Sequence, residues 1–437
     1  MTIVLKEYQS IERDDEFLSI SESKELLKYL TTLNLADALS IGVNNITATQ
    51  YVGVVCFNNK RIEVLPKLLG SKGSRALDSS LEEREQMMSS LLYMLSYTHR
   101  LKINPTGILS FNFKNENLLE VFVYLFALEL NKGLNREFPF SYEKKNENLG
   151  YVRGKIKFKE DLKHNSFNRS KIYCEFSNFQ RDNIFNQTFL YICNRLYLLS
   201  KSIETKRLLK QNIKLLEGVT NKKIEYNMIA SKDIGKSYNY LKHSLNFCKM
   251  FLKNSAPTLS SGGHDNFCIL FDMNEVFEEF IHEFITRNKE EISPEIKDIE
   301  FQRNRKLFSG WEDLNSGISA VEDRRNIKND IRVVLKDNSS IILDTKYKLI
   351  NSPFEISTSD SFQMFMYSHI ENVDEDARPR ILLLYPQYQN KISFRLPFKG
   401  SDASLEVHTL PLELDNNERR QVFLKELRNI LLKSQVT

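Results

Sequence analysis

The clearest periodic pattern in the chain lies between residues 327 and 349. From residue 331 to 335 every second position carries Ile, Val or Leu; polar residues fill 337–340, and a second apolar run covers 341–343. Alternation with period two around a short polar turn predicts a β-hairpin. Asp330 precedes the first strand, while Asp344 and Lys346 lie two residues apart at the end of the second, and so on one face. Hairpin pairing should gather these three side chains at one end of the ribbon.

The first 80 residues predict a small, β-rich α+β domain. A strand at 3–5 is followed by a helix that begins after Ser19, with Glu22 in position to complete a capping box. Two further strands, at 51–57 and 61–67, are joined by a tight turn. Residues 71–80 then change to Gly, Ser and charged residues, which predicts a domain boundary.

Residues 81–254 predict a mainly helical region. Apolar stripes indicate helices at about 82–100, 117–131, 186–216 and 236–254. A basic cluster interleaved with Tyr151 and Phe158 lies between them, and it consists of Lys144, Lys145, Arg153, Lys155, Lys157, Lys159 and Lys163. This cluster is either the solvated face of a strand or a surface that lies along DNA.

A polar segment, residues 255–265, leads into a third predicted domain that covers residues 255–437. A helix is expected at 273–288 and another at 362–370, and the continuously apolar run 381–385 is expected in the centre of a sheet. An amphipathic helix closes the chain. The predicted fold class is α+β or α/β, with a mixed sheet flanked by helices in the C-terminal domain.

Composition narrows the class of protein only modestly. The 437 residues carry 61 basic and 57 acidic side chains, so a nucleic-acid surface must arise from local clustering and not from a global charge excess. Five scattered cysteines without a C-x-x-C pair argue against a disulfide framework and a zinc site. No signal peptide and no long apolar run is seen, so a cytoplasmic protein that does not span a membrane is expected.

Two carboxylates and an ammonium group at one end of a hairpin suit phosphodiester hydrolysis. Carboxylate oxygens bind Mg²⁺, and the ion polarises a phosphate and lowers the pKa of its bound water. Lys346 could orient that water or offset the charge that develops on phosphorus. The alternative is an ordinary solvated strand end, which is the commoner meaning of a D-x-K triplet by itself.

The hairpin resembles the core of PD-(D/E)xK nucleases, and specifically the McrC subunit of McrBC-type, modification-dependent restriction systems. The members of that family carry an Asp before one strand and a D-A-K-Y-like sequence at the end of the next; here the latter reads Asp344-Thr345-Lys346-Tyr347. Asn329 replaces the Pro that often precedes the first Asp. The resemblance implies a Mg²⁺-dependent DNA endonuclease with Asp330 and Asp344 as metal ligands and Lys346 as a catalytic residue.

Further matches to McrC proteins follow in order along the chain. They are Tyr51-x-Gly53, Glu63 to Lys67, Leu91 to Tyr97, Arg153-Gly154-Lys155-Ile156, Cys174-Glu175-Phe176, Asp182 with Asn186, and Gln363-x-x-x-Tyr367. Gly154 could allow close approach of a phosphate or of a neighbouring strand. Gln363 is a candidate catalytic residue, because it shares a helix face with Tyr367 that could meet DNA or brace the catalytic strand.

The first helix of a PD-(D/E)xK fold often adds a glutamate near the metal. Glu278 matches that family position, Glu283 is the competitor, and a surface role remains open for either. His282 has no second histidine at ligand spacing and is expected to be structural or exposed.

The resemblance also implies a partner. McrC proteins act with an AAA+ GTPase ring of the McrB type, and this chain contains no Walker A sequence of its own. We therefore expect GTP hydrolysis to reside in another chain, which residues before about 150 would engage and stimulate. The competing hypothesis is a non-catalytic DNA-binding adaptor or GTPase activator that retains the nuclease fold.

Overall fold

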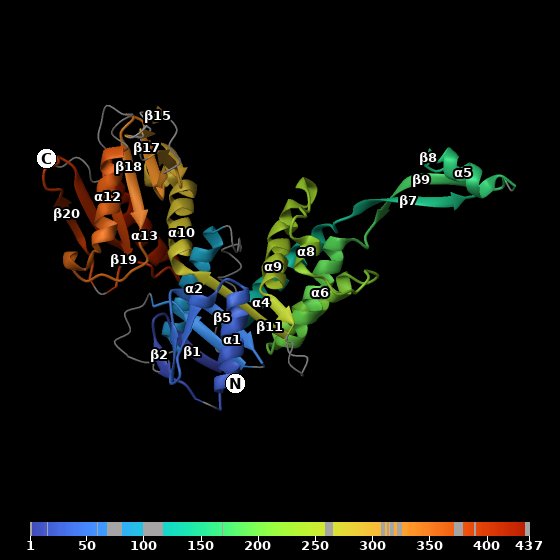
Figure 1. Ribbon diagram of the computed structural model, residues 1–437, viewed down its shortest axis with the longest axis horizontal. Helices are drawn as coiled ribbons and strands as arrows, with labels where there is room; N and C mark the ends of the chain where they lie inside the picture. Colours follow the sequence, from blue (N-terminus) through green and yellow to red (C-terminus); the bar gives the residue numbers. More distant parts are fainter. Residues whose placement is uncertain are drawn as a thin grey trace. The chain divides into compact units, whose positions relative to one another are not determined.

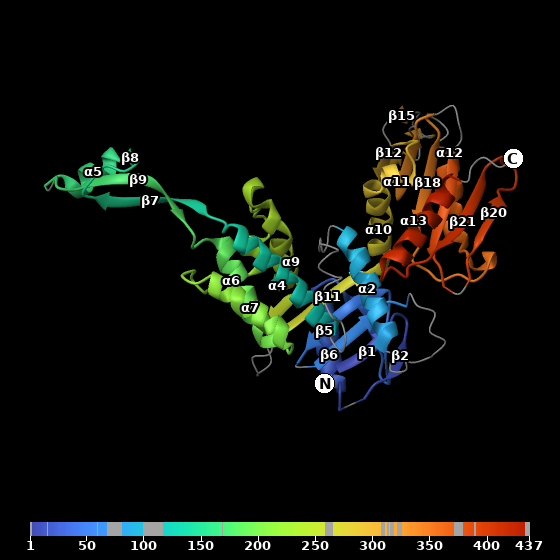
Figure 2. The same cartoon turned by 180° about the vertical axis from the view of Figure 1, so that it is seen from behind.

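The computed structural model describes residues 2–14, 16–58, 60–67, 81–98, 117–167, 169–257, 265–306, 311–312, 314, 319–320, 326–370, 379–388 and 390–432. The chain divides into two compact units (Figures 1 and 2). Unit 1 combines Met1–Asn115 with Pro257–Thr437, and unit 2 is Glu116–Ala256. The three consecutive domains predicted from the sequence differ from this division, because both ends of the chain fold into one unit and the middle is inserted between them.

The N-terminal part of unit 1 is built on the strands β1-β6-β5-β11, in that order, of a five-stranded sheet that ends in β10 (Ser255–Pro257). Its strands are β1 (Thr2–Lys6), β5 (Tyr51–Phe57), β6 (Lys60–Leu65) and β11 (Asp265–Asp272), and α1 (Ile20–Thr32) begins with the predicted capping box. Gly53 is required where β5 pairs with β11: it has φ +142°, and a Cβ there would lie 1.9 Å from the Ile269 carbonyl oxygen. Strand β11 follows the inserted unit in sequence and pairs with β5, so the segments before and after the insertion share one sheet.

A second, three-stranded sheet and a 3₁₀ turn complete this part. The sheet has the order β2-β4-β3, with β2 (Ser10–Glu12), β3 (Leu39–Ile41) and β4 (Asn45–Ala48), and the turn is η1 (Ala36–Ala38).

The C-terminal part of unit 1 contains a six-stranded mixed sheet with order β12-β17-β18-β19-β21-β20. The strands are β12 (Ile296–Phe301), β17 (Ile331–Leu335), β18 (Ser340–Thr345), β19 (Arg380–Pro386), β20 (Ser393–Pro397) and β21 (Ser404–Leu410). Strands β18, β19 and β21 are parallel to one another, and the other neighbours are antiparallel. The predicted hairpin and the central position of strand 381–385 are confirmed.

Three helices pack on this sheet. Helix α10 (Met273–Arg287) contacts β18, α12 (Thr358–Ile370) contacts β19, and α13 (Asn417–Leu432) contacts β21. One core cluster lies beneath α12, where Met364 and Tyr367 pack with Ile342, Leu383 and Val407. Shorter elements complete the domain: α11 (Lys289–Ile292), β13 (Asn304–Lys306), β14 (Trp311–Glu312), β15 (Ser319–Ala320), β16 (Asn326–Lys328) and η4 (Pro353–Glu355). The mixed α/β architecture is thus as expected.

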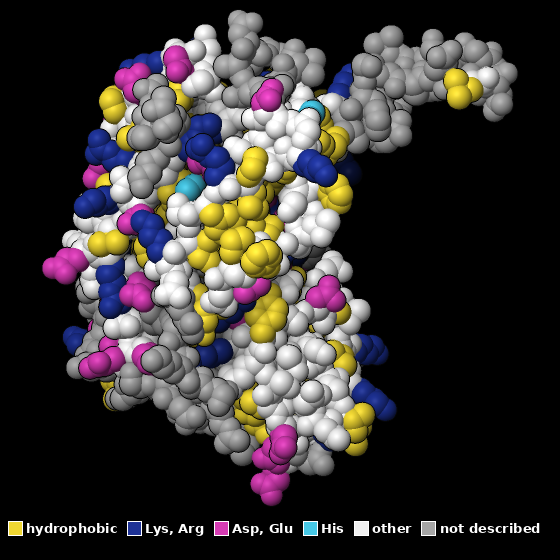
Figure 3. All heavy atoms as spheres, turned by 90° about the vertical axis from the view of Figure 1, so that its left-hand side faces the viewer, with side chains coloured by type: hydrophobic (Ala, Val, Ile, Leu, Met, Phe, Trp, Pro, Cys, Tyr) yellow, Lys and Arg dark blue, Asp and Glu magenta, His cyan; other side chains and the backbone are white. Residues whose placement is uncertain are grey.

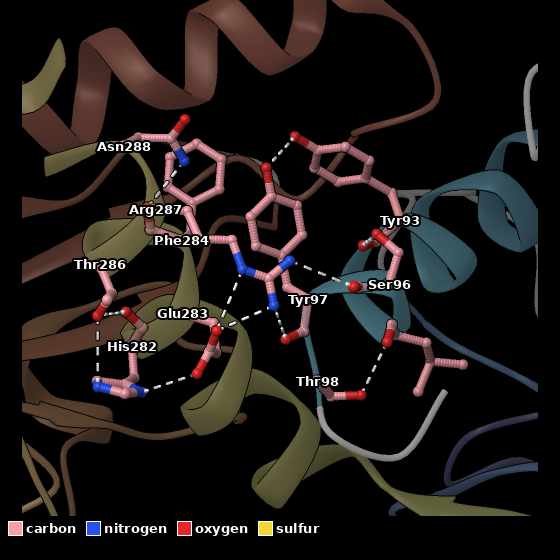
Figure 4. A network of polar contacts seen from close by, with 11 residues as sticks. Tyr93, Ser96, Tyr97, Thr98, His282, Glu283, Phe284, Thr286, Arg287 and Asn288 are labelled. Carbon is pink, nitrogen blue, oxygen red and sulfur yellow. Dashed lines mark hydrogen bonds and ion pairs between the residues drawn. The ribbon is translucent and has the colours of Figure 1, made fainter. Parts of the chain in front are cut away.

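Helix α2 (Leu81–Tyr97) belongs to unit 1, although the sequence placed it with the middle region. It packs against α10, and Arg287 donates hydrogen bonds to the last carbonyl oxygens of α2, at 2.8 Å to Tyr97 and 3.5 Å to Ser96 (Figure 4). A guanidinium at a helix C-terminus satisfies carbonyl groups that have no partner within the helix. The contact was not foreseeable from spacing, because 190 residues separate its two ends.

Unit 2 is a helical bundle from which a β-ribbon projects (Figure 1). The bundle consists of α4 (Leu118–Arg136), α6 (Ile184–Leu199), α7 (Ile203–Leu215), α8 (Tyr226–Ile229), η3 (Lys236–Leu241) and α9 (Lys242–Lys253). The ribbon, which we call the finger, consists of β7 (Ser141–Leu149), β9 (Ile172–Gln180), β8 (Lys155–Ile156) and α5 (Phe158–Asn165). A short strand, β10 (Ser255–Pro257), lies at the boundary of the units.

The single helix expected at 186–216 is two helices. The buried carboxylate of Glu120 accepts hydrogen bonds from the Ser200 hydroxyl at 2.6 Å and from the Lys201 backbone at 2.5 Å, and these bonds hold the turn between α6 and α7. Apolar periodicity continued through the break, so the sequence pattern did not reveal it.

Among the residues that the structure describes, no helix has the length and apolar character needed to cross a membrane. On the face of the molecule in Figure 3, Lys and Arg side chains are intermixed with Asp and Glu around a group of hydrophobic side chains. The coloured side chains of this face are thus neither mainly basic nor mainly acidic, in line with the near-balanced charge of the whole chain.

Candidate functional site

The predicted site residues meet at the open end of the β17–β18 hairpin. Ile331 pairs with Leu343, so Asp330 just before β17 lies opposite Asp344 near the end of β18. The Thr345 backbone N–H donates to Asp330 Oδ2 at 2.9 Å and thereby ties the start of one strand to the end of the other. The structure therefore brings Asp330, Asp344 and Lys346 together as the hairpin pattern predicted.

Asp344 is fully buried, and its carboxylate lies against the Lys346 ammonium group. Nζ of Lys346 is 2.5 Å from Oδ2 of Asp344. Apart from this ammonium group, no donor reaches either Asp344 oxygen from the part of the chain that the structure describes. A buried carboxylate with so few partners carries a large desolvation cost unless a cation balances it. The backbone of Lys346 is itself fixed, because its N–H donates to the Leu384 carbonyl at 2.9 Å.

Burial and crowding disturb the protonation equilibria of all three groups. Burial, with the neighbouring Asp330 carboxylate, raises the pKa of Asp344 to about 7 even though Lys346 opposes the shift. Burial also raises the pKa of Asp330, against the hydrogen bond from Thr345 and the charge of Lys346. For Lys346, burial alone would lower the pKa, but the attraction of Asp344 and Asp330 raises it. Such shifts are common where paired carboxylates do chemistry.

Glu278 lies on α10 and faces the same end of the hairpin. Its Oε1 accepts a hydrogen bond from Gln302 Nε2 at 2.8 Å, and Lys328 Nζ donates to Oε1 of the same glutamine at 2.7 Å. Burial and the charge of Asp330 raise the pKa of Glu278. Its competitor Glu283 is held elsewhere, by an ion pair of 2.9 Å with Arg287 (Figure 4).

The residues present fit a divalent cation in part. Across the described ranges, no cluster of three His, Cys, Asp or Glu side chains is close enough to hold a metal. Asp330 and Asp344 nevertheless offer adjacent hard oxygen donors, and within the described residues Lys346 alone reaches the Asp344 carboxylate as a donor. A small oxygen-preferring ion such as Mg²⁺ usually keeps several waters and needs only one or two carboxylates. The metal-ligand role of Glu278 stays a prediction.

Gln363 and Tyr367 hold the backbone at Lys328, just before the strand that follows Asp330. Gln363 Nε2 donates to the Tyr367 hydroxyl at 2.6 Å, and that hydroxyl donates to the Lys328 carbonyl two residues before Asp330. These contacts support the bracing alternative for the Gln363-x-x-x-Tyr367 element. A direct catalytic role for Gln363 is a prediction that this geometry does not test.

Some residues near the site were not identified from the sequence. Asp360, at the start of α12, is buried, accepts a hydrogen bond from Lys348 Nζ at 2.9 Å, and adds negative charge near Lys346. Gln302 positions Glu278, and Glu7 binds the Tyr347 hydroxyl. Local spacing gave no signal for Glu7, which is 340 residues from its partner.

The motifs of the middle region build the finger. Gly154 has φ +72°, and a Cβ there would lie 2.4 Å from the Glu175 carbonyl oxygen, so this glycine permits the approach of a neighbouring strand. The Arg153 guanidinium lies over the Phe176 ring, 4.2 Å from its centre. At the base, the Asn186 side chain donates to the carbonyls of Pro139 and Arg181 at 2.9 and 2.7 Å. The finger also exposes large apolar side chains, among them Tyr151, Val152, Phe158, Leu162 and Phe167.

Comparison with known proteins gives a consistent assignment. A family model described as McrBC 5-methylcytosine restriction system component matches residues 46–386. A protein of Escherichia coli K12, the type IV methyl-directed restriction enzyme EcoKMcrBC, is 20% identical over 336 residues, which cover 72% of this chain and 90% of that protein.

Two solved structures from Thermococcus gammatolerans share the fold. One is a half-complex from a tetradecameric assembly of McrB AAA+ hexamers with bound McrC; its matching chain has a TM-score of 0.71 and 18% identity, over 98% of this chain and all of the other. The second is the cryo-EM structure of the McrBC complex, with a TM-score of 0.52 and 20% identity, over 66% of this chain and 88% of the other. The chain belongs to the family of McrBC 5-methylcytosine restriction system components and is an McrC-like subunit.

Proposed function

We propose that this chain is the Mg²⁺-dependent endonuclease subunit of an McrBC-like restriction complex and cleaves DNA phosphodiester bonds. The observation that carries the proposal is the buried Asp344 carboxylate beside Asp330 and Lys346 at the hairpin end. A pair of buried carboxylates, one of which has a lysine as its only donor among the described residues, costs stability and suits a cation and a phosphate.

The chemistry divides among three side chains. Asp330 and Asp344 would hold the metal, and a bound Mg²⁺ supplies a Lewis acid for the phosphate and a water of lowered pKa. Thr345 fixes the direction of the Asp330 carboxylate through its backbone N–H. Lys346 presents a positive charge that stabilises the extra negative charge of a pentacovalent phosphate or orients the attacking water. The Lys328 carbonyl, held by Tyr367, limits movement of the segment that carries Asp330.

We further propose that an AAA+ GTPase ring binds the finger. The matching solved complex contains McrB AAA+ hexamers with bound McrC. The finger of this chain exposes apolar side chains, with Phe158 71% and Leu162 69% exposed, among basic residues. Exposed apolar groups of this kind usually mark a protein-binding surface. Contact through the finger would lie partly beyond residue 150, the limit expected from the sequence.

The experiment mixes the purified chain with a purified McrB-type AAA+ GTPase, GTP and a methylated plasmid. With Mg²⁺ the plasmid should be cut and GTP turnover should rise several-fold over the GTPase alone. EDTA should stop cutting, and restored Mg²⁺ should recover it. Raised GTP turnover without cutting under any of these conditions would favour the non-catalytic adaptor.

A further inference from the structure

A buried carboxylate lies behind the proposed site. Glu7 follows β1 and is only 4% exposed. Its Oε2 accepts two hydrogen bonds, from the Lys67 backbone N–H at 2.9 Å and from the Tyr347 hydroxyl at 3.1 Å. Its Oε1 has no hydrogen-bond partner within the described ranges. Glu7 therefore connects the N-terminal sheet to the residue directly after Lys346.

Tyr347 connects Glu7 to the backbone of Lys346. The Lys346 N–H donates to the Leu384 carbonyl and continues the pairing of β18 with β19, and the Lys348 N–H donates to the Lys346 carbonyl at 2.9 Å, so the backbone makes a tight turn around Tyr347. The Lys346 ammonium group lies against Asp344, and the Tyr347 side chain is buried with its ring centre 5.9 Å from that of Phe277. Phe277 directly precedes Glu278 on α10. The Tyr347 ring thus packs on the helix that carries Glu278, and its backbone directly follows Lys346.

Burial of the Glu7 carboxyl group at this contact costs free energy of folding. Burial raises the pKa of Glu7 to about 8 against the opposing hydrogen bond and charge of Lys67. Burying an ionisable group usually costs more than filling the same space with apolar side chains, and its benefit is a defined geometry. Here the geometry defined is the direction of the Tyr347 hydroxyl, and with it the backbone at Lys346.

We infer that Glu7 is a positioning residue for DNA cleavage: it holds the Tyr347 hydroxyl and so fixes the Lys346 ammonium group relative to Asp344. The inference rests on the proposed nuclease function. Glu7 is buried and bonds to Lys67 and Tyr347, not to Asp330, Asp344 or Lys346, so its removal should lower kcat and leave the KM for DNA unchanged.

The test uses the full chain with its partner, GTP and Mg²⁺. Tyr347→Phe removes only the hydroxyl, and Glu7→Leu removes the acceptor; each should lower kcat at least about tenfold, since small displacements of reacting groups are costly. Glu7→Gln keeps an oxygen that accepts from Tyr347 and should retain most of the activity. The double variant Glu7→Leu with Tyr347→Phe should be no slower than the slower single variant, because both break one contact.

A second measurement reports on Lys346 without cleavage. Brief acetylation followed by mass spectrometry compares labelling of Lys346, 20% exposed in its side chain, with that of Lys132, 52% exposed. Tyr347→Phe and Glu7→Leu should raise the relative labelling of Lys346 several-fold. Tyr93→Phe, which removes another buried hydroxyl of unit 1 that lies 3.1 Å from the Tyr97 hydroxyl, is the matched control and should change neither labelling nor kcat.

The outcomes separate the two claims. If the wild-type chain does not cut DNA, the proposed function fails, and labelling still decides whether Glu7 positions Lys346. If the wild type cuts, but folded Tyr347→Phe and Glu7→Leu cut as fast and label equally, the inference is overturned. It is also overturned if Tyr93→Phe causes the same loss of kcat.

Discussion

Two carboxylates of unit 1, Glu7 and Glu406, have pKa values that are shifted in opposite directions. Glu7 is buried with a pKa raised to about 8, so its protonated form is favoured in the folded state. For Glu406 burial works in the same direction, but hydrogen bonds from His408 and Arg380 and the charges of Arg380 and Arg395 prevail and lower the pKa to about 2. The first arrangement destabilises the fold at high pH, and the second stabilises it at neutral pH.

The first prediction concerns Glu7→Gln. The stability that Glu7 contributes is fully present below its unfolded pKa near 4.5 and is lost as the pH rises toward 8. The wild type should therefore lose about 2 kcal/mol or more relative to Glu7→Gln between pH 5 and 9. Urea unfolding at several pH values measures the difference. Glu406→Gln is the control of opposite sign, since it should be less stable than wild type at pH 7 and approach it as the pH falls toward 2. A pH-independent difference for Glu7→Gln would contradict the account.

The second prediction concerns Lys346→Ala. The Lys346 ammonium group lies against an oxygen that would hold Mg²⁺, so its removal frees that oxygen and leaves two uncompensated carboxylates. Cutting should stop, while the affinity for Mg²⁺ should be retained or increased. Calorimetric titration of both proteins with Mg²⁺ checks this. Loss of Mg²⁺ binding in a folded Lys346→Ala protein would show that the lysine has a different role.

At the scale of elements, the sequence pattern predicted the features that depend on residues close together in the chain. The β17–β18 hairpin and the meeting of Asp330 with Asp344 follow from alternation and a short turn, which sequence spacing records. The break between α6 and α7 depends on Glu120, some 80 residues away, and the Glu7–Tyr347 contact spans 340 residues. Neither feature changes the spacing of apolar residues in the nearby sequence, so the sequence analysis predicted neither of them.

The third prediction tests the finger as an element. Gly154→Ala places a Cβ 2.4 Å from a backbone oxygen at φ +72° and should destabilise the finger by about 1–3 kcal/mol. Gly150→Ala is the matched control, because nothing lies within 4 Å of its added Cβ. Hydrogen exchange of residues 141–180 should be faster in Gly154→Ala than in Gly150→Ala. Equal exchange would mean that the tight strand approach at Gly154 does not stabilise the finger.

At the scale of the whole molecule, the two proposed tasks, cleavage and partner binding, fall in different units. The candidate cleavage site lies in unit 1, which both ends of the chain build together, and the finger lies in the inserted unit 2. The division into two compact units depends on the long-range packing of β11 and α2, which the sequence pattern alone does not record. The separation predicts that damage to one task leaves the other intact.

The fourth prediction follows from that separation. Ser substitution of both Phe158 and Leu162 removes exposed apolar groups of the finger and should weaken the complex with the AAA+ GTPase by at least about tenfold. Leu198→Ser, on α6 with a side chain 81% exposed, is the control and should bind normally. Mg²⁺ affinity should be unchanged in both proteins. Unaltered complex formation on gel filtration by the double variant would place the partner's binding surface elsewhere.

The most direct test of the nuclease proposal is plasmid cleavage by Asp344→Asn. The amide preserves shape but removes the charge that would hold Mg²⁺, so cutting should be abolished while the complex with the partner and its stimulated GTP turnover persist. Asp337→Asn, in the exposed turn of the same hairpin, should cut like the wild type. If folded Asp344→Asn cuts as fast as Asp337→Asn, the cleavage site is not at this hairpin and the account is wrong.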